Sequence, residues 1–422
     1  DTAVVTVGTI GTGTWQGTAV AQAYIADNAI SLAKMAGGTD GNIISFDASG
    51  DPVAIATGND GQVLTSAGAG AQPAFEDAAG GSGADATAFV VQSAPGTAAV
   101  ATGTDDIAIG ETAVANGASA IAIGVASDAG NASGDEACIA VGAGSQALGK
   151  NGLAIGHDAI ASAEDGLAIG HDATASAEAG IAIGQAASAS VARSIAIGHS
   201  AVADTDEQGI AIGYQADAGG NSSVSIGYDA HTTASTSCAI GSYGAVASAE
   251  NAHAFGFQAS ASGVNSLALG YLPAATANGQ KSFASGQFGA VGDAQAVTFV
   301  ARGATTDATV TKINPDGGTT NDMILPINTM WGFEIDLVVR EQATGDSKKT
   351  HFSGAIKRNG SSTTALVGSV VESATVNDSG ATWTAAVTAD NSSREALQIA
   401  VTGEASHTLR WVARIEIVAV SG

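Results

Sequence analysis

The chain has 422 residues, of which 45% are hydrophobic but only 5% aromatic, and glycine alone contributes 57 residues. Its formal net charge of −26 argues against a nucleic-acid ligand, because phosphate groups would be repelled. No apolar run reaches the roughly 18 residues that a membrane-spanning helix needs, so we expect no membrane insertion. A chain of this length favours two to four domains.

Residues 1–82 predict an N-terminal segment of short elements. Asp27 or Asn28 can cap a short helix that runs to Met35. Residues 38–77 read as short strands broken by the turn sequences SGDP and NDG. The phrase GQVLTS in this segment resembles the repeated shaft segments of bacteriophage tail fibres. This likeness implies attachment through the N-terminus to other virion tail or baseplate proteins.

Residues 83–105 are rich in small residues and predict a linker, after which a regular repeat begins. Between residues 106 and 292 a motif such as LAIG or IAIG recurs, mostly every fourteen residues, and ends on a glycine. Fourteen residues fit two short strands and two tight turns, so each repeat predicts one rung of a parallel β-solenoid. At about 4.8 Å per rung, thirteen rungs span roughly 60 Å.

Alternation within a repeat predicts which side chains share a face. We expect Leu153 and Ile155 to pack inward against an alanine face of the second strand, residues 159–163. Ala154 would then point outward, and the persistence of alanine at this place suggests that another chain packs against it. So thin a coil buries too little surface to be stable alone, which predicts an obligate oligomer. Cys138 and Cys238 lie seven rungs apart, too far to form a disulfide within one chain.

The sequence SIAIGHSAVA at residues 194–203, with its copies over about residues 105–290, resembles the head repeats of YadA-like trimeric adhesins. The resemblance implies a left-handed parallel β-roll in which three identical chains associate. The expected fold class is therefore all-β: a trimeric β-roll with an N-terminal shaft and a C-terminal domain.

From residue 293 to 422 the period disappears and about nine alternating strands follow, which predicts a β-sandwich or jelly roll. Trp331, Trp383 and Trp411 each fall in register with apolar neighbours, so we assign them to its core. A domain of this kind after glycine-rich repeats resembles the distal knob of phage fibres.

Several side-chain groups allow a functional and a structural interpretation. His157 and His171 occupy equivalent places in adjacent rungs and could hold a metal ion, or form a polar ladder. The aromatic residues of the same column could stack on sugars, or pack between chains: Tyr214, Tyr228, Phe257 and Tyr271. Glu334 and Asp336 share a strand face at about 7 Å, near the carboxylate separation of glycosidases. Cross-strand ion pairs with Arg340, Arg410 and Arg414 explain that face without chemistry.

Ten of the fourteen lysine and arginine residues lie beyond residue 300. We expect receptor contact at the outward loops of this domain, residues 302–322, 341–350, 357–363 and 389–395. The predicted contact residues are Arg302, Lys348, Lys349, Lys357, Arg358 and Arg394. No catalytic triad order, metal motif, phosphate loop or nucleotide fingerprint is found, and we expect no enzyme activity, cofactor or metal.

The sequence as a whole predicts an extracellular virion tail fibre, a homotrimeric rod that presents its C-terminal domain to a host cell-surface glycan or protein. The alternative is a fragment of a cell-surface trimeric autotransporter-type adhesin. The segment ARIEIVAVSG argues against this alternative, because it lacks the membrane strands that anchor such adhesins. A polysaccharide depolymerase ranks last.

Overall fold

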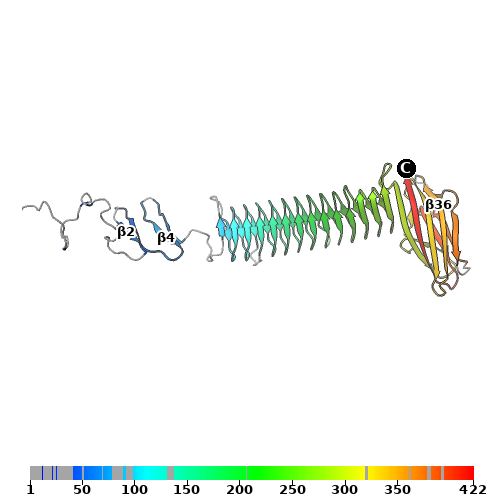
Figure 1. Cartoon of the computed structure of the whole chain (residues 1–422), viewed down its shortest axis with the longest axis horizontal. Helices are drawn as coiled ribbons and strands as arrows, with labels where there is room; N and C mark the ends of the chain where they lie inside the picture. The colour runs from blue at the N-terminus through cyan, green and yellow to red at the C-terminus, as the bar shows by residue number, and fades with distance from the viewer. Residues whose placement is uncertain are drawn as a thin grey trace, which may run out of the picture. The chain divides into compact units, whose positions relative to one another are not determined.

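The computed structural model describes residues 41–49, 52–68, 70–77, 89–91, 98–130, 137–205, 207–318, 322–360, 363–377, 382–390 and 394–422, with residues 12, 21 and 25. These residues form strands and no helix, which confirms the all-β fold class (Figure 1). They divide into two compact units, residues 1–80 and 81–422. None of them forms a helix long and apolar enough to cross a membrane. The helix expected to end at Met35 lies outside the described residues.

The first unit contains two antiparallel hairpins, as the turn sequences predict. Strand β1 (Ile43–Phe46) pairs with β2 (Pro52–Ile55), and β3 (Gln62–Thr65) pairs with β4 (Ala74–Asp77). Gly61 has a φ of 86°, which an L-residue rarely adopts, and its turn closes when Gln62 N–H donates to Asn59 O at 3.1 Å.

The repeats form a roll of two parallel sheets, and each rung gives one short strand to each sheet. Equivalent residues pair directly from rung to rung, for example Ala154 with Ala168. The first sheet of the roll contains β5 (Phe89–Val91), β7 (Ile107–Ile109), β9 (Ile121–Ile123), β11 (Ile139–Val141), β13 (Leu153–Ile155), β15 (Leu167–Ile169), β17 (Ile181–Ile183), β19 (Ile195–Ile197), β21 (Ile210–Ile212), β23 (Val224–Ile226), β25 (Cys238–Ile240), β27 (His253–Phe257), β29 (Leu267–Tyr271) and β31 (Lys281–Ser285).

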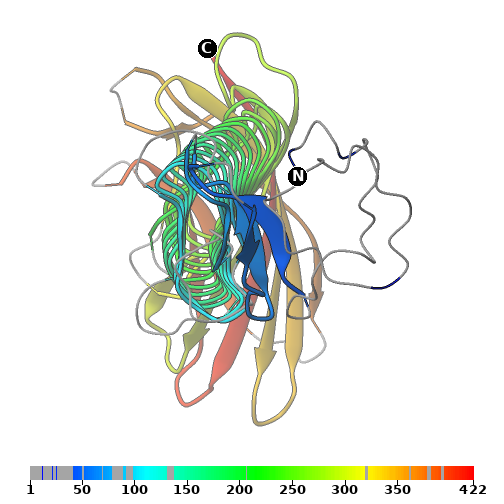
Figure 2. The same ribbon diagram turned by 90° about the vertical axis from the view of Figure 1, so that its left-hand side faces the viewer.

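The second sheet of the roll has 13 strands, which agrees with the thirteen rungs expected from the period. Its strands are β6 (Val100–Ala101), β8 (Val114–Ala115), β10 (Asp128–Ala129), β12 (Gln146–Ala147), β14 (Ile160–Ala161), β16 (Thr174–Ala175), β18 (Ser188–Ala189), β20 (Val202–Ala203), β22 (Asp217–Ala218), β24 (His231–Thr232), β26 (Val246–Ala247), β28 (Ser260–Ala261) and β30 (Ala274–Ala275). Figure 2 shows the roll end-on as a flattened coil.

The interior of the roll is made of alanine, so the expected orientation of the first strand is wrong. The alanine column is enclosed by its own coil and not by another chain. Ala154 and Ala161 are fully buried, whereas Ile155 is 38% exposed. Both sheets turn their alanines inward, and the space between them admits little more than methyl groups. The larger apolar residues of the first strand therefore point out of the coil, where they form a column that we call the apolar ladder. The ladder contains Ile109, Ile123, Val141, Ile155, Ile169, Ile183, Ile197, Ile212, Ile226, Ile240, Phe255 and Leu269.

The glycine that ends each motif is required by a corner of the coil. Gly170 has a φ of 137°, and a Cβ placed on it would lie 2.4 Å from the carbonyl oxygen of Gly184 in the next rung. A side chain would therefore meet both backbone strain and a steric clash. This confirms that glycine supplies the turn between the two strands.

One rung replaces interior alanine by hydroxyl residues and satisfies them internally. Ser225 and Thr232 stand where other rungs have alanine, and both are fully buried. Their hydroxyls lie 3.0 Å apart, and Ser225 Oγ donates to Asp217 O at 2.6 Å. Buried polar groups cost little when they are hydrogen-bonded, which accounts for the departure from alanine in this rung.

Residues beyond 293 form a sandwich of two antiparallel sheets. The large sheet contains β32 (Ala294–Thr305), β35 (Thr329–Glu341), β36 (Ser347–Arg358), β37 (Ala365–Leu366), β38 (Val371–Asn377) and β41 (Leu409–Ser421). The small sheet contains β33 (Val310–Ile313), β34 (Met323–Ile324), β39 (Thr384–Asp390) and β40 (Ala396–Thr402). Trp331, Trp383 and Trp411 are at most 4% exposed, so their assignment to the core is confirmed.

Strand β31 pairs with β29 along one edge and with β32 along the other. The roll and the sandwich therefore share one continuous sheet. The long sandwich strands extend past the width of the roll (Figure 2). The large sheet is therefore a direct continuation of the first sheet of the roll. The boundaries at 82/83, 105/106 and 292/293 stay predictions.

Candidate functional site

The candidate site is the outer face of the large sheet, which we define as the outward-facing residues of β32, β35, β36 and β41. Along β41 the alternation is complete: Trp411 and Ala413 are buried, while Arg410, Val412 and Arg414 are exposed. Antiparallel pairing places the outward-facing residues of the four strands in rows across the sheet. The face therefore displays side chains from strands that are distant in the sequence.

Two rows at one end of this face are basic. In the first row Arg410 is paired directly with Arg340. The second row runs from Arg302 through Val412 and Val338 to Lys349. Like charges on directly opposed residues destabilise a strand pair. Within the described part of the chain, Arg302, Arg340 and Arg410 form no ion pair.

The next row is neutralised by one carboxylate. Asp336 accepts from Lys349 Nζ at 3.0 Å and from Arg414 at 2.9 Å, and lies 3.2 Å from His351 Nδ1. Hydrogen bonds from Lys349 and His351, with the charges of Lys349 and Arg414, hold the pKa of Asp336 below its ordinary value. Asp336 is therefore an ionised structural group rather than a proton donor.

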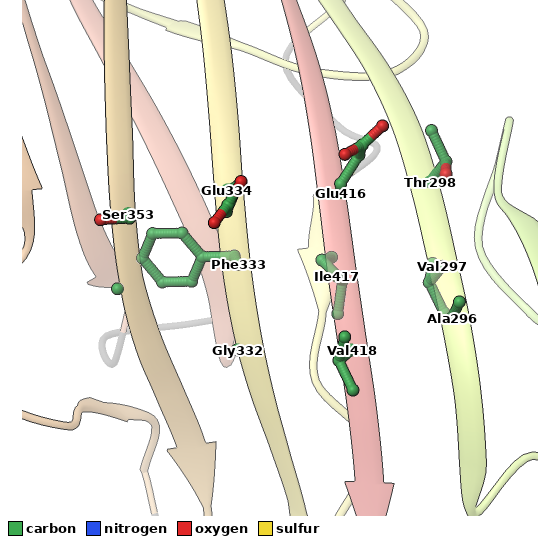
Figure 3. A pocket seen from close by; sticks show the side chains of 11 residues that line it. Ala296, Val297, Thr298, Gly332, Phe333, Glu334, Ser353, Glu416, Ile417 and Val418 are labelled. Atoms are coloured by element: carbon green, nitrogen blue, oxygen red, sulfur yellow. The ribbon is translucent and has the colours of Figure 1, made fainter. Parts of the chain in front are cut away.

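A hollow of about 610 Å³ lies beyond this row, where Gly332 leaves the sheet without a side chain. Figure 3 shows Glu334 and Glu416 side by side at one border of the hollow, with Val418 farther along β41. Glu334 is paired directly with Glu416 across the two strands. Glu416 also lies 3.6 Å from Arg414 Nε.

Glu334 and Asp336 share the outward face of β35 as expected, but they have different partners. Asp336 contacts Lys349, Arg414 and His351, and Glu334 faces Glu416 instead. The cross-strand ion pairs expected for this face are present for Arg414, but not for Arg340 or Arg410 among the described residues. Local alternation could show that these arginines face outward, but it could not give the strand pairing that brings them together.

The six predicted contact residues do not form one surface. Arg302 and Lys349 share the second basic row, whereas Lys357 lies eight residues from Lys349 along β36. Lys348 and Arg358 turn toward the inner side, where Lys348 donates to Trp383 O at 2.7 Å and Arg358 to Leu325 O at 3.1 Å. Arg394 lies 3.4 Å from Asp322.

The histidine and aromatic residues of the roll form stacked columns on its surface. The rings of His157 and His171 stack at 5.0 Å, and each ring contacts the aspartate that follows it. No group of three or more potential metal ligands is found among the described residues. Past Gln185 the same column stacks again at 4.8–5.6 Å and contains His199, Tyr214, Tyr228, Tyr243, Phe257 and Tyr271. Because each inner ring has a neighbour on both faces, a sugar has access only to the edges of the inner rings.

Comparison with known proteins gives one sequence likeness, which falls on the roll. The model of the YadA head domain repeat matches residues 101–127, 132–159, 161–187, 189–216, 218–243 and 245–272. These segments make up less than half of the chain. No curated protein matches the sequence.

Two solved structures are similar over most of the chain but only at low scores. One is a tailspike protein gp49 from Acinetobacter baumannii bacteriophage Fri1, a capsular polysaccharide depolymerase: identity is 10%, the TM-score 0.20, and the match covers 78% of this chain and 49% of that one. The other is the Acinetobacter baumannii phage AM24 tailspike protein, at 7% identity and a TM-score of 0.21, covering 76% and 68%. The chain thus spans about half the length of the first. Likeness at this level assigns no activity, and the expected lack of enzyme activity stays a prediction. The roll is a β-solenoid that resembles YadA head repeats.

Proposed function

We propose that this chain is a structural and adhesive fibre protein, a homotrimeric rod that holds its C-terminal sandwich against a cell surface. The observation that carries the proposal is the apolar ladder. Its residues are half-buried or exposed along the whole roll, and Leu269 is 45% exposed. A continuous apolar stripe of this length is typical of a surface that another chain covers.

Two further copies of the same chain are the proposed cover. The ladder repeats with the rung spacing, so an identical ladder beside it meets the same residue at every level. A closed threefold arrangement places all three ladders against one another and leaves none exposed. The match to YadA head repeats supports this arrangement. The apolar ladder also continues into the sandwich, because Phe283, Ala296 and Val418 lie in one row.

In the proposed fibre, adhesion is the task of the sandwich. Three copies on one rod turn a weak contact into a strong one, because the second and third contacts form at high effective concentration. We assign the contact to the basic residues of the sandwich and the partner to a host cell-surface glycan or protein. The N-terminal segment would attach to other tail or baseplate proteins, which makes the proposed location the virion tail. The alternative is a cell-surface trimeric autotransporter-type adhesin, which the YadA likeness favours.

Adsorption of the full chain to cells tests this function. Fluorescently labelled protein is added to a panel of encapsulated bacterial strains, with a globular protein of similar negative charge as the control. We expect saturable binding to a subset of strains, and blocking of phages that infect those strains. Binding without any blocking would favour the cellular adhesin, and no binding above the control on any strain would contradict an adhesive function.

A sugar-release assay on the same strains separates adhesion from depolymerisation. Purified capsular polysaccharide is incubated with the full chain and with a Glu334→Gln variant. We expect no new reducing ends with either protein. Reducing ends that depend on Glu334 would contradict a purely adhesive role and assign hydrolysis to the hollow beside Glu416.

A further inference from the structure

We propose that the basic end of the outer face binds the acidic groups of a polysaccharide. We call this surface the basic patch, and it consists of Arg302, Arg340, Lys349, Arg410 and Arg414. The proposal rests on the proposed function, since it names the ligand class of the adhesive sandwich.

The patch concentrates positive charge in a strongly acidic protein. Five of the fourteen lysine and arginine residues of the chain fall in three adjacent rows of one sheet face. Asp336 is the one carboxylate among the outward-facing residues that these rows pair. With a formal charge of −26 on the whole chain, such a local excess of cations attracts anions to this place and to few others.

Three arginines of the patch, Arg302, Arg340 and Arg410, lack the carboxylate partners that other cations of the sandwich have among the described residues. Lys312 lies 3.2 Å from Asp390, and Arg394 lies 3.4 Å from Asp322, and both carboxylates are almost fully buried. Arg340 and Arg410 instead oppose each other across two strands and form no ion pair with a described residue. An anion bound between them would remove the repulsion that this pairing creates.

The dimensions and chemistry of the patch fit a short stretch of acidic polysaccharide. Four neighbouring strands span about 14 Å, and the five residues from Arg410 to Arg414 also span about 14 Å along the strand. Guanidinium groups bind carboxylate, sulfate or phosphate oxygens in pairs. Between them Val300, Val338 and Val412 are about half-exposed and offer apolar contact to sugar rings. A longer, denser polyanion such as nucleic acid would extend onto the acidic remainder of the chain.

Direct binding of the full chain to defined polymers tests the assignment. The probes are polygalacturonate, dextran sulfate and neutral dextran, measured by biolayer interferometry at several salt concentrations. We expect binding to at least one acidic polymer, weakening with salt, and none to dextran. An Arg340→Gln/Arg410→Gln variant should lose at least tenfold in affinity. A Lys150→Gln/Arg193→Gln variant removes two exposed charges of the roll, outside the sandwich, and should bind as the unchanged chain does.

Polygalacturonate binding alone assigns a carboxylate ligand, and dextran sulfate binding alone assigns a sulfate-like one. Equal affinities of the two double variants, binding to neither acidic polymer, or tighter binding of duplex DNA would overturn the proposal. Tryptophan fluorescence and solution mass establish that both variants are folded and assembled as the unchanged chain is. If the Arg340/Arg410 variant still adsorbs to cells as the unchanged chain does, the patch proposal fails and the adhesive function stands. If the unchanged chain binds acidic polymers through the patch but adsorbs to no cells, the patch proposal stands and the adhesive function fails.

Discussion

In the roll the buried side chains are alanines such as Ala154 and Ala168, whereas in the sandwich they are Trp411, Phe299 and Ile335. The roll brings its two sheets so close that only methyl groups fit, and its large apolar residues remain outside. The sandwich separates its sheets widely enough to enclose large interlocking side chains. A repeat can therefore be rich in apolar residues and still depend on another chain to cover them, whereas the sandwich encloses its own core.

Truncation of a large core residue should damage the sandwich most. Trp411→Ala removes a buried indole whose Nε1 donates to Thr305 Oγ1 at 3.0 Å. Loss of burial and creation of a cavity should lower the free energy of unfolding of the sandwich by about 3–5 kcal/mol. Thermal unfolding followed by tryptophan fluorescence measures this, because three of the four tryptophans lie in this domain. A Trp411→Phe control should lose much less, and equal losses would contradict a tightly packed core.

Enlargement, rather than truncation, should damage the roll. In Ala168→Leu the larger side chain must fit between sheets that leave it no space, which should cost about 3 kcal/mol. Tyrosine fluorescence follows the roll, which contains four of the five tyrosines and no tryptophan. Ile169→Leu in the same strand is the control and should be tolerated, because Ile169 points outward. Equal tolerance of both changes would contradict the alanine interior.

Gly170→Ala tests the corner of the coil. The added Cβ meets Gly184 O at 2.4 Å, and the φ of 137° is one that alanine rarely adopts, so we expect a loss of about 1–3 kcal/mol. Circular dichroism melting measures it. Gly286→Ala, at a glycine with nothing within 4 Å of an added Cβ, should leave the transition unchanged. A larger loss at Gly286 than at Gly170 would contradict the steric account.

The smallest effect is expected for the carboxylate that organises the outer face. Because the pKa of Asp336 is lowered on folding, first of all by Lys349, its charged form stabilises the fold above its unfolded pKa. This contribution is lost as the pH falls through the lowered value. Asp336→Asn should thus cost up to about 1 kcal/mol at pH 7 and progressively less below pH ~4. A stability loss of the Asp336→Asn variant that grows as the pH falls would contradict this explanation.

The sequence was sufficient to predict the rungs, the glycine corners and the three core tryptophans, because each depends on local spacing. The inward face of the roll was assigned wrongly for a physical reason. Alternation shows that Leu153 and Ile155 share a face, but it does not say which face is enclosed. The preference for large apolar residues inside fails when the interior is as thin as two methyl groups.

The candidate site was predictable only in part. Alternation placed Arg340, Arg410 and Arg414 outward, but their alignment requires β35 to pair with β41, whose residues lie about seventy positions away. Lys348 and Arg358 could not be told from exposed cations by sequence, because their inward direction depends on Trp383 and Leu325, which other strands and loops supply.

The solution mass of the full chain, measured by light scattering, shows whether the apolar ladder is covered by two further copies. One chain has a mass of 40.7 kDa, so the trimer should have three times 40.7 kDa, about 122 kDa. A companion variant with Ile155, Ile169 and Ile183 changed to serine should shift toward the mass of one chain. A stable species of 40.7 kDa for the unchanged protein would contradict the account.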